Sequence, residues 1–486
     1  MDPTVNDLIQ RALDGADRLG ASYADVRVVE RRNEGLTVKN GALEAATTNV
    51  SAGLGIRVLV DGAWGFSSSA LLDPDEADRI AGEAVEIARA SAAAQKEPIE
   101  LDDTPPVTAE YRTPHDEDPF AVSLDDKLRI LMDADAAMSR VPGVAIRESN
   151  FMAGRETKTF ASTSGARIEQ EIVEAGAGIE ATAVNETEMQ QRSYPNSFGG
   201  QFVTGGFEAV RALDLAEHAQ ETAELAVALL DAPQCPSGEM DLVLDATQVA
   251  LQIHESCGHP TELDRVFGTE ASFAGTSFLT TDKLGSLRYG SDLVSIDADA
   301  TAPGGLGTFG YDDEGVPAQN VPLISGGILV GYLTSRETAP RIGRSSMGSA
   351  RAYAWSHIPL IRMTNINLRP GDAGSLDDLI ADTSDGIFMS VNKSWSIDDR
   401  RLNFQFGDQA GWIIKNGKRT KLVKNPTYTG ITPRFWGSLD AICSRDEWTL
   451  WGLPNCGKGE PMQIGHVGHG AAPARFRKVN VGVGRW

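Results

Sequence analysis

The sequence predicts an α+β protein of two domains. Helical and strand-like patterns are grouped together in its first half, and short glycine-rich strand patterns dominate its second half. Its 486 residues are enough for two or more domains of about 100–200 residues each. A run of turn-forming residues, Pro-Gln-Cys-Pro-Ser-Gly at 233–238, separates the halves. We therefore expect an N-terminal domain over residues 1–234 and a C-terminal domain over residues 235–486.

The N-terminal domain is predicted to contain antiparallel strands with flanking helices. Asn40-Gly41 and Asp61-Gly62 are typical hairpin turns, so residues 22–69 are expected to form an antiparallel sheet. Residues 95–119 are rich in proline and acidic residues and are expected to form a long exposed connection. Apolar periodicity predicts helices over residues 5–19, 74–94, 124–138 and 213–230, and further strands near residues 144–151, 158–162 and 168–183.

The C-terminal domain is predicted to be a strand-rich, bent or barrel-like sheet around one helix. Residues 241–244 read as a strand, and Asp245 or Thr247 can cap a helix whose apolar stripe includes Val249 and Ile253. Glycine-rich turns follow. Further strands are expected near residues 329–333, 358–365 and 404–414.

Composition narrows the choice of partners and location. The chain has 68 acidic and 44 basic residues and a formal charge of −24, which disfavours nucleic acid and anionic membranes as partners. The sequence lacks a signal-peptide pattern and an apolar run of about 20 residues, so we expect a cytoplasmic protein without a membrane span. Its four cysteines are too few for a disulfide framework in a chain of this length.

His254, Glu255 and His259 form the pattern most suggestive of chemistry. Imidazoles bind zinc-type ions through a neutral nitrogen, and a neighbouring carboxylate can take a proton from the attacking water. The same pattern also arises by chance, and a buried structural pair of histidines would explain it.

The two histidines are five residues apart, whereas the familiar His-Glu-x-x-His motif separates them by four. Five steps of an α-helix turn a side chain by about 140° away from its partner. A π-helical turn or a helix that ends before His259 would bring the rings together. Gly258 and Pro260 favour the second solution, with His254 and Glu255 in the last helical turn and His259 turning back beyond it.

A catalytic zinc site commonly has three protein ligands, so a third must come from elsewhere. Cys257 fits the apolar stripe of the helix and is expected to pack in the core. Cys456 is flanked by glycine and by Lys458, so a tight turn could present its sulfur as a thiolate. The candidates for the third ligand are Glu262, Cys257, Cys456, His466 and His469, of which the last two fit solvent or substrate contacts better.

Several separated blocks give the chain a specific resemblance. They are the 254–259 motif followed by Glu262, the run Gly310–Gln319, the run Arg362–Asn365 and the run Asn455–Lys458. In this order they resemble the TldD/PmbA family of zinc metallopeptidases, and the histidine motif makes the chain more similar to the catalytic TldD branch. Pro260 departs from the family pattern, in which a small residue or glycine follows the second histidine.

The resemblance implies a zinc (Zn²⁺) metallopeptidase of the His-Glu-x-x-x-His type. His254, His259 and Cys456 would be the metal ligands and Glu255 the general base. Unfolded or extended peptides would be the substrates, bound in a chamber lined by the 310–319 and 362–365 runs. The partner would be a second copy or a PmbA-like subunit.

Some questions remain open at the level of sequence. Tyr311, Arg351, Tyr353 and His357 are candidates to stabilise the oxyanion, and each could equally be structural. The alternative functions are a non-catalytic scaffold subunit of such a complex and a metal-dependent hydrolase of small amides.

Overall fold

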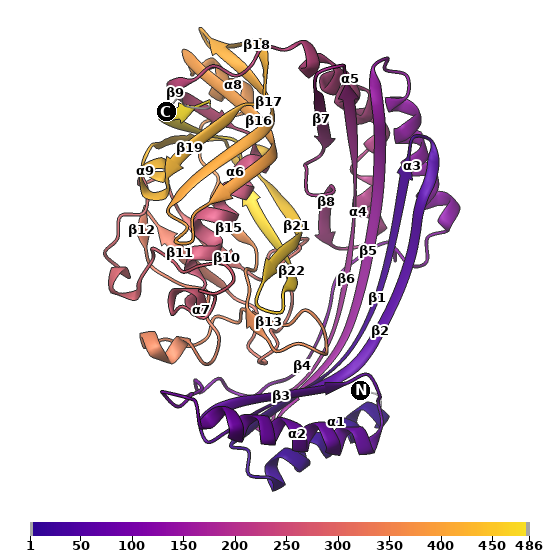
Figure 1. Cartoon of the computed structure of the whole chain (residues 1–486), viewed down its shortest axis with the longest axis vertical. Helices are drawn as coiled ribbons and strands as arrows, with labels where there is room; N and C mark the ends of the chain where they lie inside the picture. The colour runs from indigo at the N-terminus through magenta and orange to yellow at the C-terminus, as the bar shows by residue number, and fades with distance from the viewer. Residues whose placement is uncertain (1–2, 483–486) are drawn as a thin grey trace.

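The computed structural model describes residues 3–482, and a long curved sheet forms its N-terminal part (Figure 1). The strand order is β3-β2-β1-β5-β6-β4, and β7 and β8 also pair with β6. Four of the strands are 17 to 19 residues long, and they bend together into one concave wall. The strands are β1 (Tyr23–Lys39), β2 (Ala42–Val60), β3 (Ala63–Ser69), β4 (Thr108–Arg112), β5 (Val144–Ser162), β6 (Arg167–Val184), β7 (Met189–Tyr194) and β8 (Gln201–Thr204).

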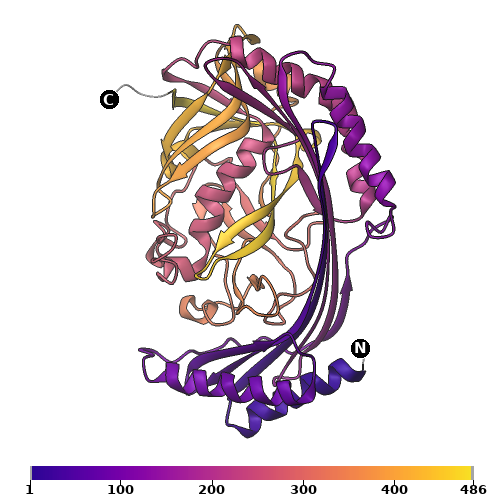
Figure 2. The ribbon, with the colours of Figure 1, turned by 45° about the vertical axis from the view of Figure 1, so that its right-hand side comes forward.

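Two pairs of helices cover the outer face of this sheet at its two ends (Figure 2). At one end α1 (Pro3–Arg18) and α2 (Pro74–Ala92) pack their apolar faces on β1 and β2. At the other end α3 (Leu124–Met138) and α5 (Leu215–Asp231) pack on β5 and β6, beside the short helix α4 (Phe207–Arg211). Many of the buried contacts are alanines, which let the helices lie close to the sheet.

The N-terminal half differs from expectation in three places. Residues 108–112 of the predicted connection form β4, which pairs in parallel with β6. The two strands expected within residues 144–162 are one continuous strand, β5. Strands β7 and β8 were not predicted, because both are short, β7 is mostly polar, and both depend on β6 for pairing.

The C-terminal part contains a closed five-stranded barrel, which confirms the barrel-like expectation. Its strand order is β16-β9-β23-β19-β17, and pairing between β16 and β17 closes the ring. Strand β18 (Lys418–Lys424) extends the sheet from β17, and β20 (Leu439–Ile442) pairs with β23. The barrel strands are β9 (Gly238–Leu244), β16 (Asp385–Ile397), β17 (Asn403–Lys415), β19 (Thr427–Ile431) and β23 (Ala474–Val481).

Helix α6 (Ala246–Ile253) leaves the barrel at the end of β9. The Asp245 carboxylate caps it by accepting a hydrogen bond from Gln248 N (2.8 Å). The helix packs between the barrel and a hairpin made of β21 (Thr449–Lys458) and β22 (Gln463–Ala471) (Figure 1). This position places the end of α6 beside the hairpin.

Smaller elements complete the C-terminal body. Of the strands expected near residues 329–333 and 358–365, only two-residue pieces form, because the chain there runs mostly through turns. Three short helices also form, α7 (Leu263–Val266), α8 (Leu376–Ala381) and α9 (Thr432–Gly437). The small strands are β10 (Ile296–Asp299), β11 (Asn320–Ser325), β12 (Ile328–Leu329), β13 (Ala350–Arg351), β14 (Leu360–Ile361) and β15 (Ile366–Leu368).

The C-terminal body lies against the concave face of the long sheet (Figure 2). Gln170 of β6 accepts hydrogen bonds from the backbone N–H groups of Gly310 and Tyr311. Buried ion pairs join the same two parts: Arg57 with Glu314 (3.0 Å), and Lys158 with Asp313 (2.6 Å). The 310–319 run thus docks the C-terminal body onto the sheet. Within residues 3–482, no helix combines the length and apolarity that a bilayer crossing needs.

Candidate metal centre

The histidine motif lies on a π-helical turn that continues α6. This turn spans His254–Gly258, and the backbone N–H of His259 donates to the carbonyl of His254, five residues earlier. The wider turn brings both rings to the same side, which an α-helix of this spacing would not do. The expectation that the helix ends before His259 was therefore wrong.

Local contacts explain why the chain continues in a helical path. Gly258 has φ −55° and is not a left-handed stop; a Cβ on it would lie 2.2 Å from Met363 Sδ. Pro260 sits in the first turn of the 3₁₀ helix His259–Thr261, where a missing N–H is tolerated. The Thr261 hydroxyl donates to the carbonyls of Cys257 (2.8 Å) and Gly258 (2.9 Å).

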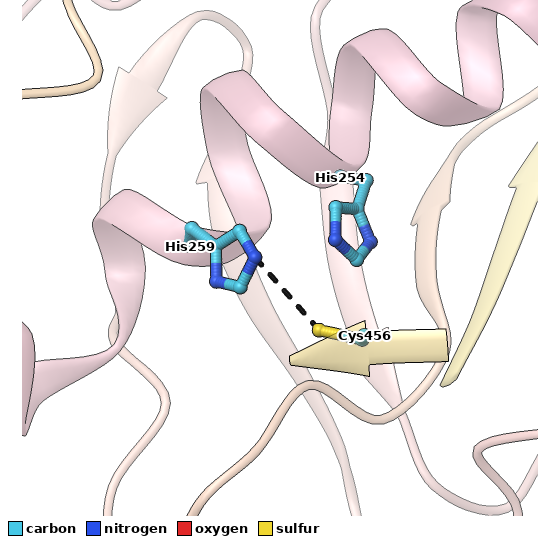
Figure 3. A group of neighbouring side chains, drawn as sticks. All are labelled: His254, His259 and Cys456. Carbon is cyan, nitrogen blue, oxygen red and sulfur yellow. Dashed lines mark hydrogen bonds between the residues drawn. The ribbon is translucent and has the colours of Figure 1, made fainter. Parts of the chain in front are cut away.

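His254, His259 and Cys456 converge at one buried point (Figure 3). Their potential ligand atoms all lie within 4.8 Å of one another, and Cys456 Sγ is 3.8 Å from His259 Nε2. Cys456 belongs to strand β21, at a register shift against β22, and not to the tight turn expected from its glycine neighbours. The bulge in this ladder positions its sulfur toward the histidines.

Each histidine uses its Nδ1 atom on a buried partner, so its Nε2 atom is free for the cluster. His254 Nδ1 lies 2.7 Å from Nε2 of His469, and His259 Nδ1 lies 3.0 Å from Oε2 of Glu262. Glu262 is held in turn by Arg265 (3.2 Å) and Lys458 (3.4 Å). A carboxylate or another acceptor behind a histidine is the usual arrangement around a protein-bound metal.

The protonation states of the three donors suit a zinc-type ion. Burial lowers the pKa of His254 to about 4 and also lowers the pKa of His259, so both rings are neutral near pH 7. Burial opposes ionisation of Cys456, but Arg362 and His259 outweigh it and lower the pKa of the thiol. Tetrahedral zinc with Zn–N and Zn–S bonds of about 2.0–2.3 Å holds its ligands roughly 3.3–3.8 Å apart. The donor set fits zinc after small side-chain adjustments.

Glu255 lies beside this cluster and is ion-paired. Its Oε2 atom accepts a hydrogen bond from Arg401 Nη1 (2.7 Å), whereas Oε1 has no protein partner among residues 3–482. Arg401 is at the tip of the β16–β17 hairpin and has a left-handed backbone, with φ 62°. The Asp398 carboxylate accepts four hydrogen bonds within this tip and fixes its shape. Sequence patterns gave no signal for Arg401, because only the folded hairpin brings it to Glu255.

The cluster and Glu255 line a cavity of about 380 Å³. Its mouth carries two large apolar side chains, Phe273 (45% exposed) and Trp395 (49% exposed). Its other walls come from the hairpin tip around Arg401 and from Leu453 and residues 455–457 of β21. The cavity can therefore admit a ligand with apolar groups close to the metal donors.

The remaining candidates from the sequence lie elsewhere. Cys257 is fully buried in the C-terminal core, as expected, and Glu262 supports His259. His466 pairs with Glu174 (2.6 Å) away from the cluster, whereas His469 contacts His254, a role that its glycine-rich surroundings did not indicate. None of the four oxyanion candidates lines the metal cavity: Tyr311, Arg351 and Tyr353 line a second cavity and His357 lies outside both.

Comparison with known families covers most of the chain. The model of the PmbA/TldA metallopeptidase C-terminal domain matches residues 237–483, that of metallopeptidase domain 1 matches residues 24–88, and that of the central domain matches residues 117–230.

Similar curated proteins include two archaeal metalloproteases. One from Methanocaldococcus jannaschii, Metalloprotease MJ0996, is 30% identical over 92% of this chain and 94% of its own length. One from Methanothermobacter thermautotrophicus is 30% identical over 97% of each chain. A zinc metalloprotease TldD homolog from Saccharolobus solfataricus is 29% identical over 51% of this chain and 52% of its own.

Solved structures show the same fold at low sequence identity. A crystal structure from Thermotoga maritima has a TM-score of 0.77 and 18% identity, and covers 98% of this chain and 100% of its own. TldE from Thermococcus kodakarensis has a TM-score of 0.72 and 16% identity, with coverage of 98% and 100%.

Proposed function

The chain belongs to the PmbA/TldA metallopeptidase family, and from this premise we propose that it is a zinc-dependent peptidase of the His-Glu-x-x-x-His type that cleaves unfolded or extended peptides. The single observation that supports this proposal most strongly is the convergence of His254, His259 and Cys456 in a cavity that also contains Glu255.

The residues around the cavity would have distinct roles in hydrolysis. His254, His259 and Cys456 would hold the zinc ion, with His469 and Glu262 fixing the two rings. A bound zinc ion supplies Lewis acidity, which lowers the pKa of water toward neutrality and polarises a carbonyl group. Glu255 accepts the proton of the attacking water at Oε1 and delivers it to the amine nitrogen of the departing peptide. Arg401 holds Oε2 and so fixes the direction of the carboxylate.

Two features favour an extended peptide as substrate. Phe273 and Trp395 expose apolar surface at the mouth of the cavity, as is common where a ligand binds. The ladder between β21 and β22 skips residues 454 and 455; Pro454 has no N–H, so a bound strand would pair with its carbonyl and with the backbone of Asn455. Backbone pairing of this kind needs an unfolded segment and little sequence preference.

The test of this proposal is Glu255→Gln, assayed on an unfolded polypeptide with zinc content measured in parallel. We expect zinc to remain bound and cleavage to fall by roughly 10²–10⁴-fold, as for other general bases. Asp446→Asn, which removes an exposed carboxylate outside the cavity, is the matched control and should retain full activity. Undiminished turnover by Glu255→Gln would remove Glu255 as the base.

The active assembly that we propose is cytoplasmic and contains two subunits, either two copies of this chain or one copy and a PmbA-like chain. Light scattering of the purified protein, alone and with a PmbA-like chain, measures the mass of the active species. A monomer that cleaves at full rate in the absence of any second subunit would contradict this part of the proposal.

A further inference from the structure

A second cavity of about 320 Å³ lies between the concave face of the long sheet and the C-terminal body. Strands β1, β5 and β6 form one wall, and the segment around Arg351 together with the start of β22 forms the other. Figure 1 shows β22 between the barrel and β6. The cavity carries apolar surface from Phe202, Leu306, Phe309 and Tyr353 as well as charged groups.

All three carboxylates that line this cavity already lie against basic side chains. Arg155, at its edge, is paired with Asp118 outside it (2.8 Å). The three lining carboxylates are therefore already engaged and do not pair with any further positive group in the cavity. The pairs are Glu156 with Arg31 (2.7 Å) and Lys158 (3.1 Å), Asp313 with Lys158 (2.6 Å), and Glu174 with His466 (2.6 Å).

Arg351 has no carboxylate within ion-pair distance among residues 3–482. Its Nη2 atom donates to the backbone carbonyls of Met363 and His466, and its Nε and Nη1 atoms have no acceptor in the described part of the chain. Arg362 also lines the cavity and also lacks a carboxylate; it donates to the carbonyls of Gln463 (3.0 Å) and Cys456. The half-buried Arg351 thus lies without a carboxylate in contact, whereas the buried Arg362 favours the thiolate of Cys456.

An unpaired guanidinium such as that of Arg351 is costly to desolvate unless an anion completes it, because buried charge needs a partner of opposite sign. Burial and the charge of Arg362 lower the pKa of Arg351 to about 10, although Asp313 and Glu174 act in the opposite direction from a distance. The surplus of positive charge is local, since the whole chain carries −24. An anion that enters the cavity would relieve this imbalance.

We propose that the second cavity binds a carboxylate group of a peptide ligand through Arg351. Both Nη2 hydrogens of Arg351 are donated to carbonyls, so its Nη1 group and its positive charge would hold the carboxylate. The three paired carboxylates around the cavity disfavour a doubly charged phosphate more strongly than a singly charged carboxylate. The apolar side chains of the cavity suit the neighbouring residues of a peptide.

The position of the cavity connects it to the metal centre. Pro454 of β21 lines the second cavity, whereas its neighbours Leu453 and Asn455 line the metal cavity. Arg362 contacts the backbone of Cys456 directly. A peptide held near the metal donors therefore has the carboxylate site close by, across strand β21. This inference rests on the proposed function. The carboxylate is the C-terminus of the peptide or an acidic side chain.

The experiment measures binding without turnover, in the zinc-loaded Glu255→Gln chain. Three fluorescent hexapeptides of otherwise identical sequence are compared by anisotropy: one with a free C-terminus, one with a C-terminal amide, and one amide with a central aspartate. We expect a carboxylate-bearing peptide to bind about 10-fold more tightly than the plain amide. Preference for the first identifies the terminus, and preference for the third identifies an acidic side chain.

Arg351→Met should abolish this difference, and Arg351→Lys should retain part of it. Arg155→Met is the matched control, because Arg155 lines the same cavity but already has Asp118 as its partner. Equal binding of all three peptides to the zinc-loaded Glu255→Gln chain with Arg351 intact, or no binding of any, would overturn the inference. This outcome does not depend on whether an Arg351 variant folds. Competition by inorganic phosphate as strong as that by acetate would overturn the assignment to a carboxylate.

Because cleavage is not measured, this result is independent of the proposed peptidase activity. A chain that binds carboxylate peptides but never cleaves them would contradict only the proposed function. A chain that cleaves all three peptides and binds them with equal affinity would contradict only the carboxylate site.

Discussion

Cys456 is 197 residues from His259 in sequence, yet its sulfur completes the three-donor cluster. Cys456→Ser replaces a thiolate by a hydroxyl, which ionises far less readily and binds zinc more weakly. We expect zinc bound per chain, measured by mass spectrometry after dialysis, to fall from about one to well below one.

Cys235→Ser is the control for this experiment, since Cys235 is half-buried and lies outside the cluster. It should bind as much zinc as the unmodified chain. Equal zinc content in the Cys456→Ser and Cys235→Ser chains would exclude Cys456 from the site.

Arg401 fixes the Glu255 carboxylate through one short hydrogen bond. With Glu255 in the proposed role of general base, Arg401→Gln would remove the ion pair and let the carboxylate move away from the direction in which it takes the proton. We expect kcat to fall by about 10–100-fold with zinc content and KM little changed, because misplacement of a catalytic group by about 1 Å costs that much. The exposed neighbour Arg400 offers the comparison: Arg400→Gln should keep its activity, and equal losses in both variants would point to damage of the loop as a whole.

The residues that the structure brings together were among the candidates from the sequence, but the residues that hold them were not recognised in that role. His254, Glu255 and His259 lie within six residues of the chain, whereas Cys456 was one of five candidates for the third ligand and was singled out only by the family resemblance. His469 and Arg401 are brought to the site by long-range strand pairing and by a hairpin tip. Neither kind of contact leaves a local pattern in the sequence.

At the scale of the element, the π-helical turn allows two histidines five residues apart to face the same side. Gly258 lies in this turn, and a Cβ there would meet Met363 Sδ at 2.2 Å. Gly258→Ala should therefore lower the free energy of unfolding by about 1–3 kcal/mol through overpacking. Urea denaturation of the zinc-loaded chain measures this change.

A double variant and a control separate this effect from the general behaviour of glycine in helices. Met363→Ala added to Gly258→Ala should recover part of the loss, which a double-mutant cycle would show as coupling. Gly82→Ala, in α2 with no atom within 4 Å of the added Cβ, should be neutral or stabilising by up to about 1 kcal/mol. If the Gly258→Ala chain is as stable as the Gly82→Ala chain, Met363 moves aside without lowering the free energy of unfolding.

Elements with strong local patterns were predicted well. Helix α3 spans Leu124–Met138, as expected from its apolar face and from Ser123, whose side chain accepts from Asp126 N. Strands β21 and β22 were missed, because glycine and polar residues interrupt their alternation and their pairing is supplied by each other. Gly258 and Pro260 usually end helices, and for that reason the prediction at this point was wrong. Here Gly258 allows tight packing against Met363, and Pro260 lies in a 3₁₀ turn.

At the scale of the molecule, buried charges fasten the C-terminal body to the sheet. Glu314 pairs with Arg57 (3.0 Å) and also accepts from the backbone N–H of Arg336 (2.6 Å). Glu314→Ala should lower the free energy of unfolding by about 3 kcal/mol, the low end for a broken buried pair. The loss is limited because Asp25 still contacts Arg57 (2.7 Å).

Asp385→Ala removes an exposed partner of Lys415 and is the control. Exposed pairs contribute at most about 1 kcal/mol, so its unfolding curve should nearly overlay that of the unmodified chain. Similar small changes in both variants would show that Glu314 contributes no more than a surface carboxylate.

The long strands of the curved sheet also limit how this molecule can be divided. The family models treat residues 24–88 and 117–230 as separate units, yet β1 in the first pairs with β5 in the second from Asp25 to Lys39. A fragment ending at residue 88 would leave that whole edge of β1 open to any strand it meets, including its own copies. Exchange of segments between relatives therefore has to carry β1, β2, β5 and β6 together. This half of the protein can therefore be exchanged only as the complete curved sheet.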